Sequence, residues 1–293
     1  MRVAAIVVTC NRKELLRCCL DCLAEQTVPP DAVYLVDNAS TDGTGEMVLL
    51  RRQKGLIYSN TGANLGGAGG FARGVRLAAS ADYDVLWLMD DDTLPEPGAL
   101  EKLLAADREL KGNYGWLSSR AVDRRGNDQP MNRQRVTPYR DIAGYDLPRV
   151  PAVMASFVSL LVPVSVVRRF GLPIADFFIW SDDWEYTRRI SRELPCYVIS
   201  DSRVIHAMKN PGVVNIATDT QERWSRYRWF YRNDVVLYRR EGLRGWLWLL
   251  AKYLWHTIQV LRDHRGHRAE RVRVIWRGFF EGTKFHPDIE YLK

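Results

Sequence analysis

Four short apolar runs alternate with amphipathic segments over the first 90 residues, and this alternation restricts the folds open to the chain. The runs are rich in β-branched residues, as expected for strands that are covered on both faces of a sheet. Strands that alternate with helices form a mostly parallel sheet, because each helix returns the chain by a right-handed crossover. We therefore predict an α/β, Rossmann-like fold with strands at residues 2–8, 32–36, 55–60 and 85–89 and helices at residues 12–26, 44–53 and 71–80.

The local signals become weaker after residue 100. The pattern predicts a helix at 100–110, a polar excursion at 120–146, one strand at 150–162, a helix within 179–192 and a strand at 196–204. At the other end of the chain, Asn11 precedes the first helix and is expected to cap it with its side chain.

The formal charge of +7 is concentrated in the C-terminal quarter. Residues 221–293 hold 16 Lys and Arg against 8 Asp and Glu, together with six of the ten Trp, whereas residues 1–220 hold 26 against 27. Basic residues interleaved with aromatic ones suit an anionic membrane surface or a nucleic-acid backbone. We therefore expect an α/β domain over residues 1–215 and a helical, basic and aromatic region over residues 216–293.

The segment 242–261 is the most apolar part of this region. A membrane-spanning helix needs about 20 predominantly apolar residues, and Arg244, Lys252 and His256 interrupt the segment. The favoured prediction is an amphipathic helix that lies on a membrane surface; packing on the α/β domain is the main alternative, and spanning is disfavoured.

The five Cys point to a cytoplasmic protein. Their number is odd, and a strand-like apolar run in place of a signal peptide begins near Met1. We therefore expect reduced thiols in the cytoplasm.

Polar motifs follow each of the first four predicted strands. Ligands of open parallel sheets bind outside the carboxyl ends of the strands. Thr9 and Arg12 follow the first strand, Asp37 follows the second, and a glycine-rich segment at 64–70 follows the third. We predict that these side chains converge on one ligand site at this edge of the sheet.

Three consecutive aspartates, Asp90, Asp91 and Asp92, follow the fourth strand. Adjacent carboxylates repel one another, so the cluster is costly without a cation. Divalent cations such as Mg²⁺ take oxygen ligands and share them with bound phosphates. Asp90 and Asp92 point to the same side of an extended segment. We predict this pair as metal ligands and Asp91 as facing a bound ribose or the protein; an acidic cap for the next turn is the alternative.

The glycine-rich segment can bring backbone close to a phosphate. The N-terminus of the helix after it favours an anion, so Asn64, Gly66 and Gly67 are candidate contacts. Arg73 and Arg12 are candidates to reach a diphosphate. The alternative for the glycines is tight packing of a helix on the sheet.

A second acidic cluster is flanked by tryptophans. Indole rings stack on sugar faces, so Trp180 and Trp184 are candidate platforms, and Asp183 is a candidate general base beside an acceptor hydroxyl. Asp182 and Glu185 either bind the acceptor or hold the site in shape. A capped helix start with surface acids is the alternative for the whole cluster.

His206 follows the last predicted strand. A neutral imidazole can complete a metal shell made of two carboxylates. A single His is more often structural, so the residues alone leave both roles open.

Together these motifs resemble family 2 glycosyltransferases over about residues 1–210. The matching segments are 7–12, 36–44, 64–70, 90–92 and 180–185. The resemblance implies a GT-A fold and an inverting transfer of a sugar from a nucleotide-sugar donor. His206 follows these segments and is similar to a metal-binding histidine found in part of the family.

The resemblance also implies roles for individual residues. It implies that Thr9 and Asp37 contact the nucleoside, that Asp90 and Asp92 hold Mn²⁺ or Mg²⁺ on the diphosphate, and that Asp183 is the base.

Within the family, the chain resembles bacterial galactofuranosyltransferases most in segments 64–71 and 178–185. These enzymes use UDP-galactofuranose and extend cell-wall or surface polysaccharides. The resemblance implies a polysaccharide acceptor, and the basic, aromatic tail predicts a location at the inner face of the cytoplasmic membrane, where a polyprenyl-linked acceptor is found. Rhamnosyltransferases that use dTDP-rhamnose share much of the pattern and stay open as the alternative.

Two other classes are less well supported. A nucleotidyltransferase is the nearest enzymatic rival, but residues 5–12 lack its glycine-rich signature. A basic nucleic-acid- or glycan-binding protein without catalysis is the rival from a binding class. The acidic clusters argue against nucleic acid as a partner, and the full set of carboxylates argues against a non-catalytic protein.

Overall fold

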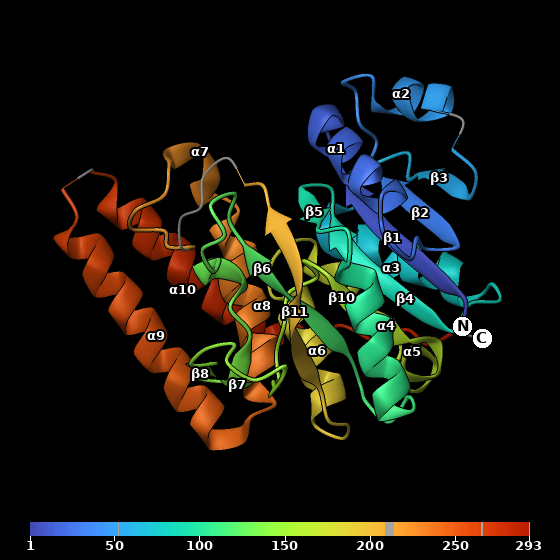
Figure 1. The fold of residues 1–293 in the computed structure, drawn as a ribbon. Coiled ribbons are helices and arrows are strands. Elements are labelled where there is room, and N and C mark those ends of the chain that lie inside the picture. The colour runs from blue at the N-terminus through green and yellow to red at the C-terminus, as the bar shows by residue number, and fades with distance from the viewer. Residues whose placement is uncertain (52, 209–213, 265, 293) are drawn as a thin grey trace.

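The computed structural model describes residues 1–51, 53–208, 214–264 and 266–292 (Figure 1). Its centre is a nine-stranded sheet with the order β3-β2-β1-β4-β10-β6-β11-β5, in which β9 also pairs with β11. The first four strands are parallel, and each is followed by the helix or turn that the alternation predicts. Their bounds are β1 Val3–Thr9, β2 Ala32–Asp37, β3 Leu56–Asn60 and β4 Val85–Asp90. The predicted α/β fold with a mostly parallel sheet is therefore confirmed.

The second half of the sheet is mixed. β10 runs antiparallel to both β4 and β6, while β11 is parallel to β6 and antiparallel to β5 and β9. A separate two-stranded ribbon pairs β7 with β8. The bounds are β5 Thr93–Pro95, β6 Leu117–Val122, β7 Arg135–Thr137, β8 Arg140–Asp141, β9 Arg149–Pro151, β10 Leu160–Pro163 and β11 Tyr197–His206, with a 3₁₀ turn at Pro130–Asn132.

The prediction of one strand over 150–162 is wrong. The segment forms β9 and β10 at its two ends, and the residues between them leave the sheet. Thr187 explains the departure, because its hydroxyl oxygen accepts from the backbone N–H of Ala155 at 3.1 Å and donates to the carbonyl of the same residue. The middle of this apolar run thus packs against α6 and does not pair with another strand of the sheet.

Helices cover both faces of the sheet. α1, α2 and α4 pack on one face, where Leu16, Val48 and Leu100 join one buried cluster. α3, α5 and α6 pack on the other face, where Phe71 and Tyr186 join a second cluster. The bounds are α1 Lys13–Ala24, α2 Thr44–Arg51, α3 Gly66–Ala79, α4 Ala99–Leu110, α5 Val164–Phe170 and α6 Asp182–Ser191, with a 3₁₀ turn at Ala175–Phe177. This is the three-layer arrangement expected of alternating strands and helices. Residue 52, in the predicted helix at 44–53, lies outside the described residues.

The start of α1 differs from the prediction. Asn11 does not cap the helix; its Oδ1 accepts from the backbone N–H of Thr41 at 2.7 Å. The carboxylate of Asp42 instead accepts from the N–H of Lys13 at 2.9 Å. The capping residue, Asp42, lies in the loop after β2. The sequence around Asn11 therefore gives no signal for this cap.

The glycine-rich segment is mostly helix, because α3 begins at Gly66 rather than at Phe71. A Cβ atom on Gly70 would lie 2.5 Å from Val8 Cγ1, and one on Gly74 would lie 2.5 Å from Ile6 Cγ2. Both glycines therefore let α3 approach β1 closely, which is the packing role that the sequence left open as the alternative.

The C-terminal helices form a bundle against the α/β domain. They have their own aromatic core, which also includes Met154 and packs against Trp180 and Trp184. Figure 1 shows α9 along the outer edge of the molecule, at the opposite end from β3. None of the helices over the described residues is long and apolar enough to cross a membrane. The bounds are α7 Gln221–Trp224, α8 Tyr227–Arg239, α9 Gly242–Arg262 and α10 Arg268–Lys284.

Candidate active site

Asp90, Asp92 and His206 come together at the carboxyl edge of the sheet. The potential ligand atoms of these three residues all lie within 4.8 Å of one another. Strand pairing explains their meeting, because β5 runs back along β11 with Thr93 opposite His206. The backbone N–H of Ala207 then donates to the carbonyl of Asp92 at 2.8 Å. His206 is therefore the last residue of a strand, not a residue of the loop after it.

Asn132 orients the His206 ring. Its Oδ1 lies 2.7 Å from His206 Nδ1, and an amide oxygen only accepts, so Nδ1 carries a hydrogen and Nε2 is the ring nitrogen that faces Asp92. His206 Nε2 and Asp92 Oδ1 are 3.1 Å apart. Ligands at about 2.1 Å on adjacent octahedral positions are separated by roughly 3 Å, so this pair fits a divalent cation such as Mg²⁺ or Mn²⁺.

The acidity of the aspartates is strongly perturbed. Burial, reinforced by the charge of Asp92, raises the pKa of Asp90 to about 7. Burial also raises the pKa of Asp91 to about 6, despite the charge of Arg12. Burial acts in the same direction on Asp92, but the hydrogen bond and charge of His206, with Arg12, lower the pKa of that carboxyl overall. Clustered carboxylates of this kind are stabilised by a bound cation.

Arg12 and Thr9 hold the aspartates from the side of β1. Arg12 donates to Asp91 at 3.1 Å and to Asp92 at 2.7 Å, while half of its side chain stays exposed. Thr9 is 2% exposed and donates its hydroxyl to Asp91 at 2.7 Å. Thr9 therefore supports Asp91, and in this arrangement it offers almost no surface to a nucleoside.

Asp37 lies at the end of β2 but has no exposed surface. Its carboxylate accepts from the hydroxyl of Tyr58 at 2.6 Å and from the N–H of Ser40 at 2.8 Å. A direct contact with a nucleobase, which the resemblance implies, is not available while Tyr58 covers this group.

The start of α3 contacts the turn before α6. A Cβ atom on Gly66 would lie 2.0 Å from the carbonyl oxygen of Phe178, and Ala68 donates its N–H to that oxygen at 3.1 Å. The N–H of Gly66 itself is taken by Asn64 Oδ1 at 2.9 Å. Gly66 thus contacts protein where a phosphate contact was predicted, whereas Gly67 faces open space.

Arg73 lies apart from the metal-ligand cluster. Its Nε donates to Ser59 Oγ on β3 at 3.0 Å. Two strands, β2 and β1, separate β3 from β4, which carries Asp90. The structure therefore brings Arg12, and not Arg73, to the aspartates.

Asp183 lies in the first turn of α6 and is half-buried. Its carboxylate accepts from the N–H of Trp184 at 2.7 Å. Burial, then the charge of Asp182, raises the pKa of Asp183 well above its usual range, and the charge of Asp90 acts in the same direction. Burial also raises the pKa of Asp182 to about 6. The two acidic clusters thus influence each other across one site, and a carboxyl with a raised pKa suits proton transfer.

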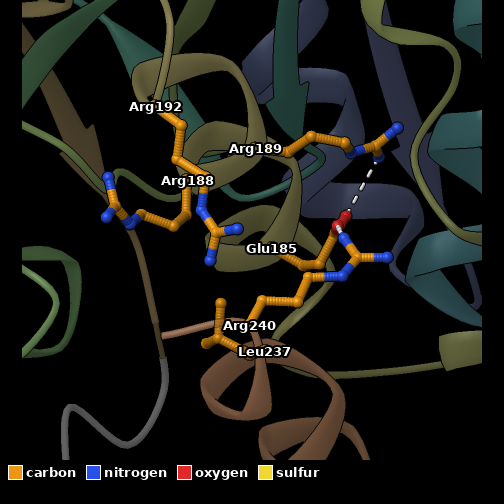
Figure 2. A pocket seen from close by; sticks show the side chains of 6 residues that line it. All are labelled: Glu185, Arg188, Arg189, Arg192, Leu237 and Arg240. Carbon is orange, nitrogen blue, oxygen red and sulfur yellow. Dashed lines mark hydrogen bonds and ion pairs between the residues drawn. The ribbon is translucent and has the colours of Figure 1, made fainter. Parts of the chain in front are cut away.

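Glu185 is turned away from this site and is 1% exposed. It accepts from Arg189 at 3.0 Å and from Arg240, the residue after α8, as Figure 2 shows. The cavity between α6 and α8 beside these groups measures about 30 Å³, which holds only one or two waters. Glu185 is therefore engaged by two arginines, which favours the second of the two roles expected for it, holding the site in shape.

The two tryptophans are partly engaged by protein. Trp180 packs against Tyr227 and Phe230, with ring centroids 5.1 and 5.9 Å apart. Trp184 carries the guanidinium of Arg135 at 4.3 Å from its ring centroid. Both side chains remain half-buried, so the indole surface left for a sugar is smaller than the sequence suggested.

Two asparagines of this site have no signal in the sequence. Asn132 lies in the polar segment 120–146, and Asn233 on α8 contacts the turn before α6. Each is a single polar residue that reaches its partner across more than 50 positions of the chain.

Comparison with known proteins places the chain among sugar-transferring enzymes. The sequence pattern described as glycosyl transferase family 2 matches residues 4–161. Galactofuranosyltransferase GlfT1 of Mycobacterium tuberculosis is 30% identical over 286 residues, which is 90% of this chain and 91% of that protein.

Two solved structures are similar in fold. Residues 1–349 of S. aureus TarS in complex with UDP superpose with a TM-score of 0.56 at 16% identity, over 97% of this chain and 72% of that chain. The mannosyltransferase PcManGT from Pyrobaculum calidifontis, in complex with GDP-Man and Mn²⁺, gives 0.57 at 17% identity, over 97% and 76%. The fold is thus of the GT-A kind, and the family match runs from β1 into β10. The chain is a glycosyltransferase and belongs to glycosyl transferase family 2.

Proposed function

We propose that this glycosyltransferase moves galactofuranose from UDP-galactofuranose to a glycan acceptor, with inversion at the anomeric carbon. One observation supports this proposal most: Asp90, Asp92 and His206 form a compact ligand set, in a chain similar over nine-tenths of its length to a galactofuranosyltransferase.

Asp90, Asp92 and His206 are proposed to hold a divalent cation, Mn²⁺ or Mg²⁺. PcManGT, which shares the fold, is described in complex with Mn²⁺. Such an ion, when bound, neutralises the charge that develops on the departing diphosphate. Asn132 holds the tautomer of His206 that leaves Nε2 free to act as a ligand.

The donor side is proposed to use the residues at the strand ends. Arg12 is half-exposed above the aspartates and contacts the diphosphate, while Asp91 fixes its guanidinium. Gly67 offers open backbone at the start of α3, beside Asn64. In this proposal the roles of Thr9, Asp37 and Arg73 are indirect, because their side chains contact Asp91, Tyr58 and Ser59 of β3.

Asp183 is proposed to take the proton of the acceptor hydroxyl as that oxygen attacks the anomeric carbon. Its raised pKa makes it a stronger base than an exposed aspartate. Attack from the side opposite the diphosphate inverts the configuration. Asp182 supports the base from the same turn, and Trp180 and Trp184 line the acceptor side.

The C-terminal region, residues 216–293, is proposed to bring the enzyme to the inner face of the cytoplasmic membrane, where a polyprenyl-linked acceptor is found. α9 exposes a row of apolar side chains, which suits burial in a lipid interface. They are Leu243, Leu247, Leu254, Trp255 and Leu261, each more than half exposed. Replacing Leu254 with Glu is expected to weaken co-sedimentation with anionic vesicles; the same change at Leu49, an exposed leucine of α2 outside the C-terminal region, serves as the control.

Transfer assays with a panel of nucleotide sugars, a lipid-linked acceptor, and either Mn²⁺, Mg²⁺ or a chelator test the proposal. Consumption of UDP-galactofuranose that stops on chelation is the expected result. Turnover with dTDP-rhamnose instead would keep the site roles but replace the donor. Turnover that continues in chelator would overturn the metal site.

A further inference from the structure

The turn that leads into α6 has an unusual backbone. Phe178, Trp180 and Ser181 have φ angles of 63°, 66° and 63°, a region that side chains other than glycine enter only at a cost in energy. Ser181 is the residue immediately before Asp182 and Asp183. A turn of this kind persists only when its surroundings hold it in place.

Asn233 of α8 contributes much of the contact that keeps this turn in place. Its side chain is fully buried, and its amide donates to the carbonyl oxygens of Phe177, Ile179 and Trp180 at 2.9, 3.0 and 2.9 Å. Arg232 fixes the orientation of this amide, because its guanidinium donates to Asn233 Oδ1 at 2.8 Å. One buried side chain therefore binds three backbone carbonyl groups of the strained turn.

Asp234 and Lys252 extend the contact to α9. The hydroxyl of Ser181 donates to Asp234 Oδ1 at 3.0 Å. Lys252 of α9 pairs with the other carboxylate oxygen of Asp234, and both groups are largely buried. Lys252 is one of the charges that interrupt the apolar segment 242–261, so this interruption has a specific partner inside the protein.

Other polar contacts join α6 to Arg240 and Glu241, between α8 and α9, and do not involve the turn at 177–181. Arg240 pairs with Glu185, and Glu241 pairs with Arg188 and Arg192. These contacts begin at the fourth residue of α6, after Asp183. Asn233 differs from them because it contacts the backbone that comes before Asp183, and Asp234 differs because it contacts the side chain of Ser181 in the same turn.

We propose that Asn233, Asp234 and Lys252 are positioning residues for Asp183, and that the C-terminal helices are thereby part of the catalytic centre rather than only a means of reaching a membrane. This inference rests on the proposed role of Asp183 as the base. A base must lie within hydrogen-bond reach of the acceptor hydroxyl. A shift of about 1 Å caused by a distant substitution is enough to lower the rate by about 100-fold.

Asn233→Ala in the full chain tests the inference, with Val235→Ala as its matched control. Val235 is equally buried on the same helix but packs against Gly282 of α10. We expect Asn233→Ala to lower kcat by about 100-fold while the KM for the nucleotide-sugar donor stays the same, because the donor binds at the strand ends. Val235→Ala is expected to lower the melting temperature but to keep kcat.

Lys252→Met gives a second test if Asn233→Ala does not fold. This change leaves the Asp234 carboxylate buried without its partner, and we expect kcat to fall. Adding Asp234→Asn removes that charge and keeps an acceptor for Ser181, so the double variant is expected to recover most of the lost kcat.

Wild-type kcat in Asn233→Ala, or equal losses of kcat in Asn233→Ala and Val235→Ala, would overturn the inference. In the second test, a double variant Lys252→Met/Asp234→Asn whose kcat is no higher than that of Lys252→Met would also overturn the inference. Absence of transfer by the wild-type protein with every donor would instead overturn the proposed function.

Discussion

Replacing Asn132 tests the proposed metal site from outside, because in the proposal this residue orients a ligand and is not one itself. It reaches the site through the contact between its Oδ1 and His206 Nδ1, at 2.7 Å in a position 5% exposed. In Asn132→Leu this acceptor is lost, so the ring is free to rotate and to adopt the other tautomer. Outer-shell partners of this kind typically contribute about 10–100-fold to metal affinity, which corresponds to about 1.4–2.7 kcal/mol.

The assay is a titration of activity with Mn²⁺ at saturating donor, together with direct Mn²⁺ binding followed by electron paramagnetic resonance. Asn132→Leu is expected to shift both midpoints to about 10–100-fold higher Mn²⁺. Asn132→Asp keeps an acceptor for Nδ1 and is expected to bind Mn²⁺ at least as tightly as the wild type. Asn127→Ala, an exposed asparagine of the same polar segment, is the control. Unchanged midpoints in Asn132→Leu would refute the assignment of His206 as a ligand.

Three further predictions concern the base, the packing of α3 and the aspartate cluster. Asp183→Asn is expected to lower kcat by about 10²–10⁴-fold and to leave donor affinity unchanged in a calorimetric titration; near-normal turnover would exclude it as the base. Gly70→Ala, whose Cβ would lie 2.5 Å from a methyl group of β1, is expected to lower the free energy of unfolding by about 1–3 kcal/mol in urea, whereas Gly67→Ala, in open space, is not. Burial raises the pKa of Asp90 to about 7 and that of Asp91 to about 6, from 3.8. In chelator, stability should therefore fall as pH rises from about 4 to about 7, because folding disfavours the ionised forms; added Mn²⁺ should stabilise more at pH 7 than at pH 5, and equal stabilisation at both would contradict this reasoning.

The parts of the fold that depend on local patterns were predictable. β1 to β4 are short apolar runs with a helix or turn after each, so their order along the chain nearly fixes a parallel sheet. The position of Asp90 at the end of β4 follows from the same pattern. The family resemblance then added roles that no local pattern could give.

The parts that depend on contacts between distant segments were not predictable. Asn11 has the residue type of a cap, but Asp42 from another loop takes the N–H group that needs one. The glycines of α3 fit both a phosphate loop and close packing, and only the position of β1 decides between the two. Asn132 and Asn233 are single polar residues, and a sequence without its fold does not distinguish them from surface asparagines.

The pairing of β5 with β11 has a consequence for how the protein matures. Asp92 and His206 are 114 positions apart, and they meet only when the last strand of the sheet has docked beside β6 and β5. A nascent chain that has left the ribosome only up to the end of α5 contains Asp90 and Asp92. It still lacks His206 and the strand β11 whose pairing with β5 and β6 positions that residue. Such long-range pairings form late in folding. The proposed ion site is therefore complete only after roughly two-thirds of the polypeptide has left the ribosome, so ion capture at that site would mark a correctly closed topology.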